Sequence, residues 1–239
     1  MAKGIMWQWL KQNYKVALVC FVAFTWCSAL VLSRSVWTGS GTYLFLGFNL
    51  GLAAFPLAFS TLAVTTDKRA LRVLYGCLWL LFFPNAPYII TDLMHLKTVS
   101  GAPAWFDVLM ICSCAGTGLA FAYISLAEVH GAFVRHGSHK IGGAMVVFVC
   151  FAAAFGIYLG RFLRWHSVHL FSSPISILSD IADRFFNPTL HPRTWAFTLG
   201  FGTLLLLGYW FLKAGAHVLV ERQLQFQSTG RTVPRNEGS

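Results

Sequence analysis

Six stretches of the chain consist almost entirely of apolar residues, and most of the charged residues lie between them. Each stretch is close to the roughly 20 residues that an α-helix needs to cross the hydrocarbon core of a bilayer. The stretches cover residues 16–32, 43–64, 73–91, 105–127, 141–160 and 195–213. The pattern therefore predicts an all-α, polytopic membrane bundle of about six transmembrane helices.

The third apolar stretch is interrupted by Pro84 and Pro87. Proline has no backbone N–H to donate, and it disfavours helical geometry in the residue before it. In hydrocarbon, the carbonyls that such a break frees are tolerated only where protein or a water-filled cavity surrounds them. We therefore expect the third helix to break at Pro84–Pro87, and we interpret the break as the mark of a site.

Polar side chains follow this break directly. If the helix resumes with Asn85 as its N-cap, three residues at positions i, i+4 and i+7 share one face. These are Tyr88, Asp92 and His95. Asp92 and His95 are candidate catalytic residues, because their side chains serve as acids and bases or hold a divalent metal. The alternative is a packed kink followed by a solvated helix end.

The fifth stretch ends in a basic and aromatic segment. Arg161, Trp165 and His169 share a face if the helix continues, and Arg164 lies beside Arg161. Arginines at a helix end often reach toward headgroups, which is the alternative interpretation. Pairing with Asp92 or Asp107, or with a bound phosphate or carboxylate, is the functional one.

Other polar residues give weaker signals. Asp107 opens the fourth stretch, where an acid in a first helical turn complements the helix dipole. We add Asp107 to the candidate ligand-binding residues, which are Asn85, Tyr88, Asp107, Arg161, Arg164, Trp165 and His169. Asn49, in the second stretch, predicts a hydrogen bond between helices. His130, His136 and His139 are predicted to lie in a solvated loop.

The charges assign a topology. With 56% hydrophobic and 11% charged residues, the chain is too apolar for an ordinary soluble domain. The net charge of +10 is spread between the apolar stretches, so we expect no nucleic-acid partner. Placing the N-terminus inside puts twelve Lys and Arg residues in the cytoplasm and six outside, in accord with the positive-inside rule. The six outside are Arg34, Lys97, Arg161, Arg164, Arg184 and Arg193.

This topology divides the chain into a cytoplasmic basic lead-in (1–15), a single transmembrane domain (16–213) and a cytoplasmic polar tail (214–239). Both termini are therefore expected in the cytoplasm. Within the last outer loop, an apolar stripe opposite polar residues predicts a short amphipathic surface helix near 174–186.

Three segments resemble the signature of a family of bacterial multi-pass membrane proteins catalogued as a domain of unknown function. They are FFPNAPYIITDL at 82–93, WFD at 105–107 and GIYLGRFLRW at 156–165. The resemblance spans about 42–213 and implies a bacterial inner-membrane protein, but it supplies no activity. The family pattern has Asn and Asp where His166 and His169 stand here. A carboxylate and an imidazole at position 169 both suit a metal.

Three functions fit these observations. The first is an inner-membrane protein whose outward-facing polar site binds an anionic headgroup or envelope-related substrate. This protein would act as a membrane enzyme if Asp92 and His95 are catalytic, with a divalent metal near them as one option. The second is a small transporter or channel that uses the broken helix to line a pathway. The third is a non-catalytic module that binds lipid or an envelope protein partner.

Overall fold

The computed structural model describes residues 2–95, 101–163 and 174–230, and these residues form helices and no strand. Six helical segments are long and apolar enough to cross a membrane. They are Asn13–Thr38, Leu44–Thr65, Arg69–Met94, Ala104–Arg135, His139–Phe162 and Pro192–Gln225. Each contains or overlaps one of the six predicted stretches, so the prediction of an all-α bundle with about six spans is confirmed.

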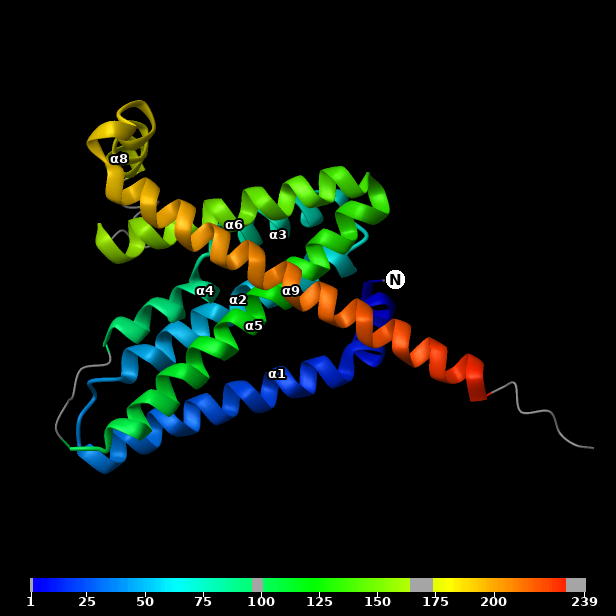
Figure 1. The fold of residues 1–239 in the computed structure, drawn as a ribbon, viewed down its shortest axis with the longest axis horizontal. Coiled ribbons are helices and arrows are strands. Elements are labelled where there is room, and N and C mark those ends of the chain that lie inside the picture. The colour runs from blue at the N-terminus through cyan, green and yellow to red at the C-terminus, as the bar shows by residue number, and fades with distance from the viewer. Residues whose placement is uncertain (1, 96–100, 164–173, 231–239) are drawn as a thin grey trace, which may run out of the picture.

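The long helices follow one another up and down through the molecule (Figure 1). They are α1 (Ala2–Thr38), α2 (Leu44–Thr65), α3 (Arg69–Phe82), α5 (Ala104–His136), α6 (His139–Phe162) and α9 (Pro192–Gly230). The third span continues from α3 through the short α4 (Asn85–Tyr88) and the 3-10 helix η1 (Ile89–His95). Helix α8 (Pro174–Phe186) and the 3-10 helix η2 (Pro188–Leu190) precede α9.

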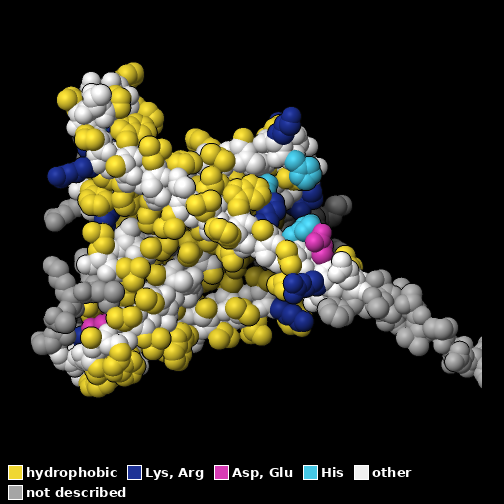
Figure 2. Space-filling view, viewed as in Figure 1, with side chains coloured by type: hydrophobic (Ala, Val, Ile, Leu, Met, Phe, Trp, Pro, Cys, Tyr) yellow, Lys and Arg dark blue, Asp and Glu magenta, His cyan; other side chains and the backbone are white. Residues whose placement is uncertain are grey.

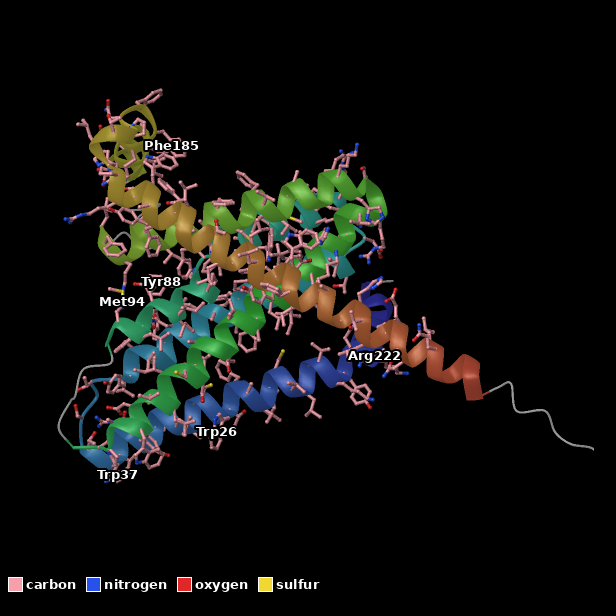
Figure 3. The ribbon with its side chains drawn as sticks, viewed as in Figure 1. Trp26, Trp37, Tyr88, Met94, Phe185 and Arg222 are labelled. Atoms are coloured by element: carbon pink, nitrogen blue, oxygen red, sulfur yellow. The ribbon has the colours of Figure 1, made fainter. Side chains whose placement is uncertain are left out.

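The connections gather at two ends of the molecule. The α8 end holds α8, the connection from α1 to α2 and the start of α5. The α5–α6 end holds the turn from α5 to α6 and the turn from α2 to α3. Trp37, Met94 and Phe185 lie toward the α8 end, and Arg222 lies toward the other (Figure 3). Between the ends, hydrophobic side chains cover most of the visible face (Figure 2).

Helix α5 is the centre of the bundle. It packs against α1, α2, α4, η1 and α6, and it is the most buried of the six spans. Helix α1, by contrast, leaves large apolar side chains such as Phe21 and Val19 exposed. In a bilayer these apolar side chains contact the lipid chains and so stay out of water.

The third span breaks where the two prolines predict it to break, and local donors bond two of the carbonyls next to the break. Pro87 has no N–H for the carbonyl of Phe83, which instead accepts from Ala86 N at 3.2 Å. The carbonyl of Phe82 then accepts from the side-chain Nδ2 of Asn85 at 3.0 Å. Asn85 is therefore the first helical residue of α4, and our prediction that it is the N-cap is wrong.

Two glycines let the neighbouring helices approach this break closely. A Cβ added to Gly118 of α5 would lie 2.6 Å from the carbonyl oxygen of Ala86. A Cβ added to Gly156 of α6 would lie 3.2 Å from Pro84 Cγ. The broken segment thus packs closely against α5 through the backbone of Ala86 and against α6 through the ring of Pro84, and larger residues at the two glycines would hinder this packing.

Helix α8 occupies the predicted range of 174–186, and aromatic contacts attach it to the bundle. The ring of Phe185 lies 5.5 Å from that of Phe155 on α6 and 5.2 Å from that of Trp195 on α9, between centroids. Phe186, next in the chain, is 83% exposed. One aromatic face of α8 is therefore anchored, while other apolar side chains remain available to a membrane surface.

The two terminal helices extend beyond the predicted apolar stretches 16–32 and 195–213. Helix α1 already begins at Ala2 and changes direction at Asn13, whose φ and ψ of −112° and 15° are not helical. Helix α9 continues to Gly230, well into the range of 214–239 that we predict as a polar tail.

We predict that Gly118→Ala lowers the free energy of unfolding by about 1–3 kcal/mol, because the added methyl group meets the backbone of Ala86. Gly116→Ala, on the same helix, is the matched control, since a Cβ there meets nothing within 4 Å. Thermal unfolding in detergent should show a lower midpoint for Gly118→Ala and an unchanged or higher one for Gly116→Ala. Equal midpoints for the two variants would contradict the close packing.

Candidate functional site

Three membrane spans each contribute one side chain to a buried polar cluster, consisting of Asp92 from η1, Arg161 from α6 and Asn49 from α2. Asp92 Oδ1 accepts from Arg161 Nη1 at 3.0 Å, and Asp92 Oδ2 accepts from Asn49 Nδ2 at 3.0 Å. Arg161 Nη2 also donates to the carbonyl of Thr91 at 2.8 Å. The Asp92 side chain is fully buried, so its charge is balanced by protein groups alone.

Tyr88 completes the surroundings of Arg161. The Cζ atom of Arg161 lies 5.6 Å from the centroid of the Tyr88 ring, which is cation–π distance. Thr91 Oγ1 donates to the Tyr88 carbonyl at 2.6 Å, a contact three residues back that suits the 3-10 geometry of this segment. Tyr88 and Asp92 therefore both contact Arg161, whereas Asn85 bonds to Phe82 instead.

Burial explains why these groups must meet. A buried carboxylate is costly unless it is paired and hydrogen-bonded. Arg161 is in the last turn of α6, and 13% of its side chain is exposed. Two of its five N–H groups are used by Asp92 and Thr91, and no other described residue takes the remaining three.

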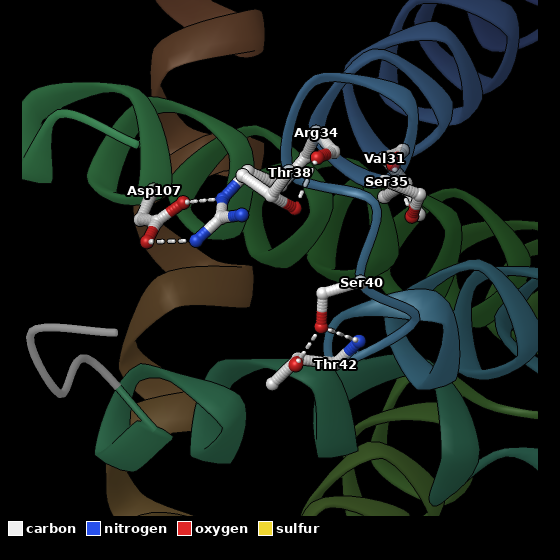
Figure 4. Close-up of polar contacts among 7 residues, drawn as sticks. All are labelled: Val31, Arg34, Ser35, Thr38, Ser40, Thr42 and Asp107. Atoms are coloured by element: carbon white, nitrogen blue, oxygen red, sulfur yellow. Dashed lines mark hydrogen bonds and ion pairs between the residues drawn. The ribbon is translucent and has the colours of Figure 1, made fainter. Parts of the chain in front are cut away.

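Asp107 belongs to a second ion pair. Its oxygens accept from Nε and Nη2 of Arg34 on α1, at 2.6 and 3.3 Å (Figure 4). Both residues are less than 5% exposed. Such a two-pronged contact fixes the position of both planar groups. Asp107 therefore ties α5 to α1, and Asp92 ties the broken third span to α6.

Tyr43 lies beside this second ion pair. Its ring centroid is 5.3 Å from Arg34 Cζ, and its hydroxyl has no hydrogen-bond partner among the described residues. Burial raises the pKa of the Tyr43 hydroxyl, and the charge of Asp107 raises it further. The hydroxyl therefore stays protonated at neutral pH.

Sequence reasoning counted Arg34 only as an outer charge and missed its role. The available signal was its position at the end of an apolar helix, on the side that the predicted topology places outside, where the positive-inside rule disfavours cations. Four other candidates cannot be compared with the structure. The side chain of His95, and Arg164, Trp165 and His169 entirely, lie outside the described residues.

His130 is not in a solvated loop, and our prediction for it is wrong. Helix α5 continues to His136, which carries His130 into the bundle, where it is 3% exposed. Its Nδ1 lies 2.7 Å from Tyr209 Oη and 3.2 Å from Lys213 Nζ, both on α9. The apolar stretch ends before the helix does, and this hid the burial from sequence reasoning.

No group of three or more His, Cys, Asp or Glu side chains is arranged to hold a metal ion in the part of the chain that the structure describes. Each oxygen of Asp92 already accepts a hydrogen bond, one from Arg161 and one from Asn49. A metal near Asp92 and His95 stays a prediction.

The fold and its buried ion pairs define a multi-pass helical membrane protein. The family model described as "Protein of unknown function (DUF1361)" matches residues 48–207, and the chain belongs to this family. The match covers the break, Asp107 and Arg161. No curated protein and no solved structure matches the chain.

We predict that Arg161→Met lowers the free energy of unfolding by about 3–5 kcal/mol, because it leaves the fully buried Asp92 without its cation. The control is Glu221→Gln, which breaks an exposed pair with His217 on α9. Thermal unfolding of the purified protein should separate the two variants clearly. If both unfold at the temperature of the parent protein, the buried pair contributes nothing to stability.

Proposed function

We propose that this chain is a cytoplasmic-membrane protein of bacteria whose α8 end faces outward and binds the anionic headgroup of a lipid or lipid-linked envelope substrate. The observation that carries the proposal is the guanidinium of Arg161, which Asp92, Thr91 and Tyr88 hold in one orientation. A guanidinium held this way presents its remaining N–H groups as a fixed fork, the geometry that suits phosphate or carboxylate oxygens.

The depth of the site favours a headgroup as the ligand. Arg161 lies in the last turn of α6, at the end of a membrane span, where lipid phosphates are found. Asp92 cancels one positive charge, and Arg164, three residues later in the sequence, supplies another. In the sequence, the segment 161–164 therefore carries two positive charges, against the one negative charge of Asp92.

Asp92 acts in this proposal as a positioning residue. A carboxylate that is fully buried and bonded on both oxygens cannot approach a substrate proton without losing Arg161. This arrangement favours binding over acid/base catalysis by Asp92. If the protein is an enzyme, we propose that His95, alone or with a metal, is its catalytic residue.

The proposed orientation is testable directly. We expect a green fluorescent protein fused after Ser239 to fluoresce, because it folds in the cytoplasm. Alkaline phosphatase inserted at Ser40, in the α1–α2 connection, should be active, because it folds outside. Phosphatase activity at the C-terminal position together with none at Ser40 would reverse the topology.

Lipid binding is tested by the change in unfolding temperature when phosphatidylglycerol replaces phosphatidylcholine in mixed micelles. The parent protein should be stabilised by phosphatidylglycerol, and Arg161→Gln should need about tenfold more of it, because a charge-assisted hydrogen bond is lost. Each variant is compared with its own baseline, so a general loss of stability does not count.

Arg193→Gln is the matched control, since Arg193 is an exposed arginine at the same end. It should keep the response of the parent protein. A second arm replaces the lipid with soluble glycerol phosphate. Equal stabilisation by glycerol phosphate would point to a free phosphate ligand, and equal responses of the two variants would contradict a site at Arg161.

A further inference from the structure

A third carboxyl group lies inside the membrane region, far along α5 from Asp107. Glu128 belongs to the span Ala104–Arg135 and is half-buried, about 12 Å before the α5–α6 end of its helix. In the part of the chain that the structure describes, its two hydrogen-bonding partners, Ser60 and Thr61, both belong to α2. Ser60 Oγ lies 2.5 Å from Oε2, and Thr61 Oγ1 lies 3.3 and 3.2 Å from the two carboxyl oxygens.

The absence of a cation separates Glu128 from the other carboxyl groups buried in the spans. Asp92 is paired with Arg161 and Asp107 with Arg34, whereas Glu128 forms no ion pair with any Lys, Arg or His that the structure describes. In low-dielectric surroundings, an unpaired carboxyl group favours its neutral form. A bound proton therefore neutralises Glu128, whereas an arginine neutralises the acid at each of the other two sites.

The described neighbours of Glu128 supply no competing charge. Helix α1 offers the thiol of Cys20, and α2 offers two hydroxyl groups. His130 follows two positions later on α5, but its Nδ1 contacts Tyr209 and Lys213. The electrostatic surroundings of Glu128 are thus set by burial and by hydroxyl groups.

Counting protons at Ser60 shows how the site accommodates both forms of Glu128. Ser60 Oγ is 3.0 Å from the Leu57 carbonyl and 2.5 Å from Glu128 Oε2, yet it has one proton to donate. When Glu128 is ionised, Ser60 donates to the carboxylate. When Glu128 is protonated, its O–H donates to Ser60 Oγ, and Ser60 donates to Leu57. Every hydroxyl proton is bonded in both forms, without movement of the heavy atoms.

We propose that Glu128, with Ser60 and Thr61, is a proton-binding site within the membrane region. The reaction is the reversible addition of a proton from water at the α5–α6 end to the carboxylate. Helix α2 contacts two acids, Asp92 through Asn49 and Glu128 through Ser60. Asn49 and Ser60 lie on the same face of α2, about 17 Å apart along its axis. The acid near Asn49 is fixed by an arginine, and the acid near Ser60 gains and loses a proton.

The test uses the full chain in phosphatidylcholine vesicles with N,N′-dicyclohexylcarbodiimide, which modifies protonated carboxyl groups in apolar surroundings. The carboxyl O–H adds across one C=N bond of the reagent, and the product rearranges to a stable N-acylurea. Peptide mass spectrometry should find the label on Glu128 and not on Asp92. Above the midpoint of the Glu128 titration, the labelling rate should fall about tenfold per pH unit, because the protonated fraction of Glu128 falls by the same factor.

Glu128→Gln is the matched variant, since its amide also donates to Ser60 and keeps the fold. It should carry no label and lack the infrared C=O band of a protonated carboxyl group, which the parent protein should show and lose as the pH rises. That band decides the matter if the reagent does not reach the site. The proposal would be overturned if Glu128 showed neither a titrating band nor a label, or if Asp92 were labelled equally. It would also be overturned if Na⁺, but not choline, protected Glu128 from labelling at constant pH, because the site would then bind a metal cation.

Discussion

The ion pair between Asp92 and Arg161 is the interaction on which the α8 end of the molecule depends. The break at Pro84 and Pro87 removes backbone hydrogen bonds inside the third span, so that span cannot be held together by its own helix. Arg161 reaches it from α6 and bonds both the carboxylate of Asp92 and the carbonyl of Thr91. One side chain thus neutralises a buried charge and donates to a backbone carbonyl of the same segment, and Asn49 adds α2 to the same cluster.

The two ends of the bundle treat their acids differently. At the α8 end, Asp92 and Asp107 are each paired with an arginine from another span, which orders the helix ends around them. Toward the α5–α6 end, the partners that Glu128 has in the described part of the chain are hydroxyl groups. The first arrangement suits a fixed, charged recognition surface, and the second suits a group that exchanges a proton. Residues of α2 and α5 take part in both arrangements.

Much of this architecture is local in the sequence and could be predicted. Apolar length gives the six spans, proline chemistry gives the break, and the misplaced charge of Arg161 points to a pairing with an acid. Contacts between helices are a different matter, because no sequence spacing says that Arg34 of α1 is beside Asp107 of α5. The 3-10 geometry after Tyr88 and the hydrogen bond from Asn85 to the Phe82 carbonyl likewise could not be predicted from residue spacing. The extension of α5 past its apolar stretch hid both His130 and Glu128.

A double-mutant cycle between Asp92 and Arg161 tests most directly whether their pairing holds the broken span to α6. The variants Asp92→Asn, Arg161→Gln and their combination would be unfolded reversibly in mixed micelles, and the coupling energy would be taken from the four free energies. We expect a coupling of about 2 kcal/mol or more, with the double variant more stable than the sum of the two single losses implies. Additive losses, within about 0.5 kcal/mol, would contradict the account.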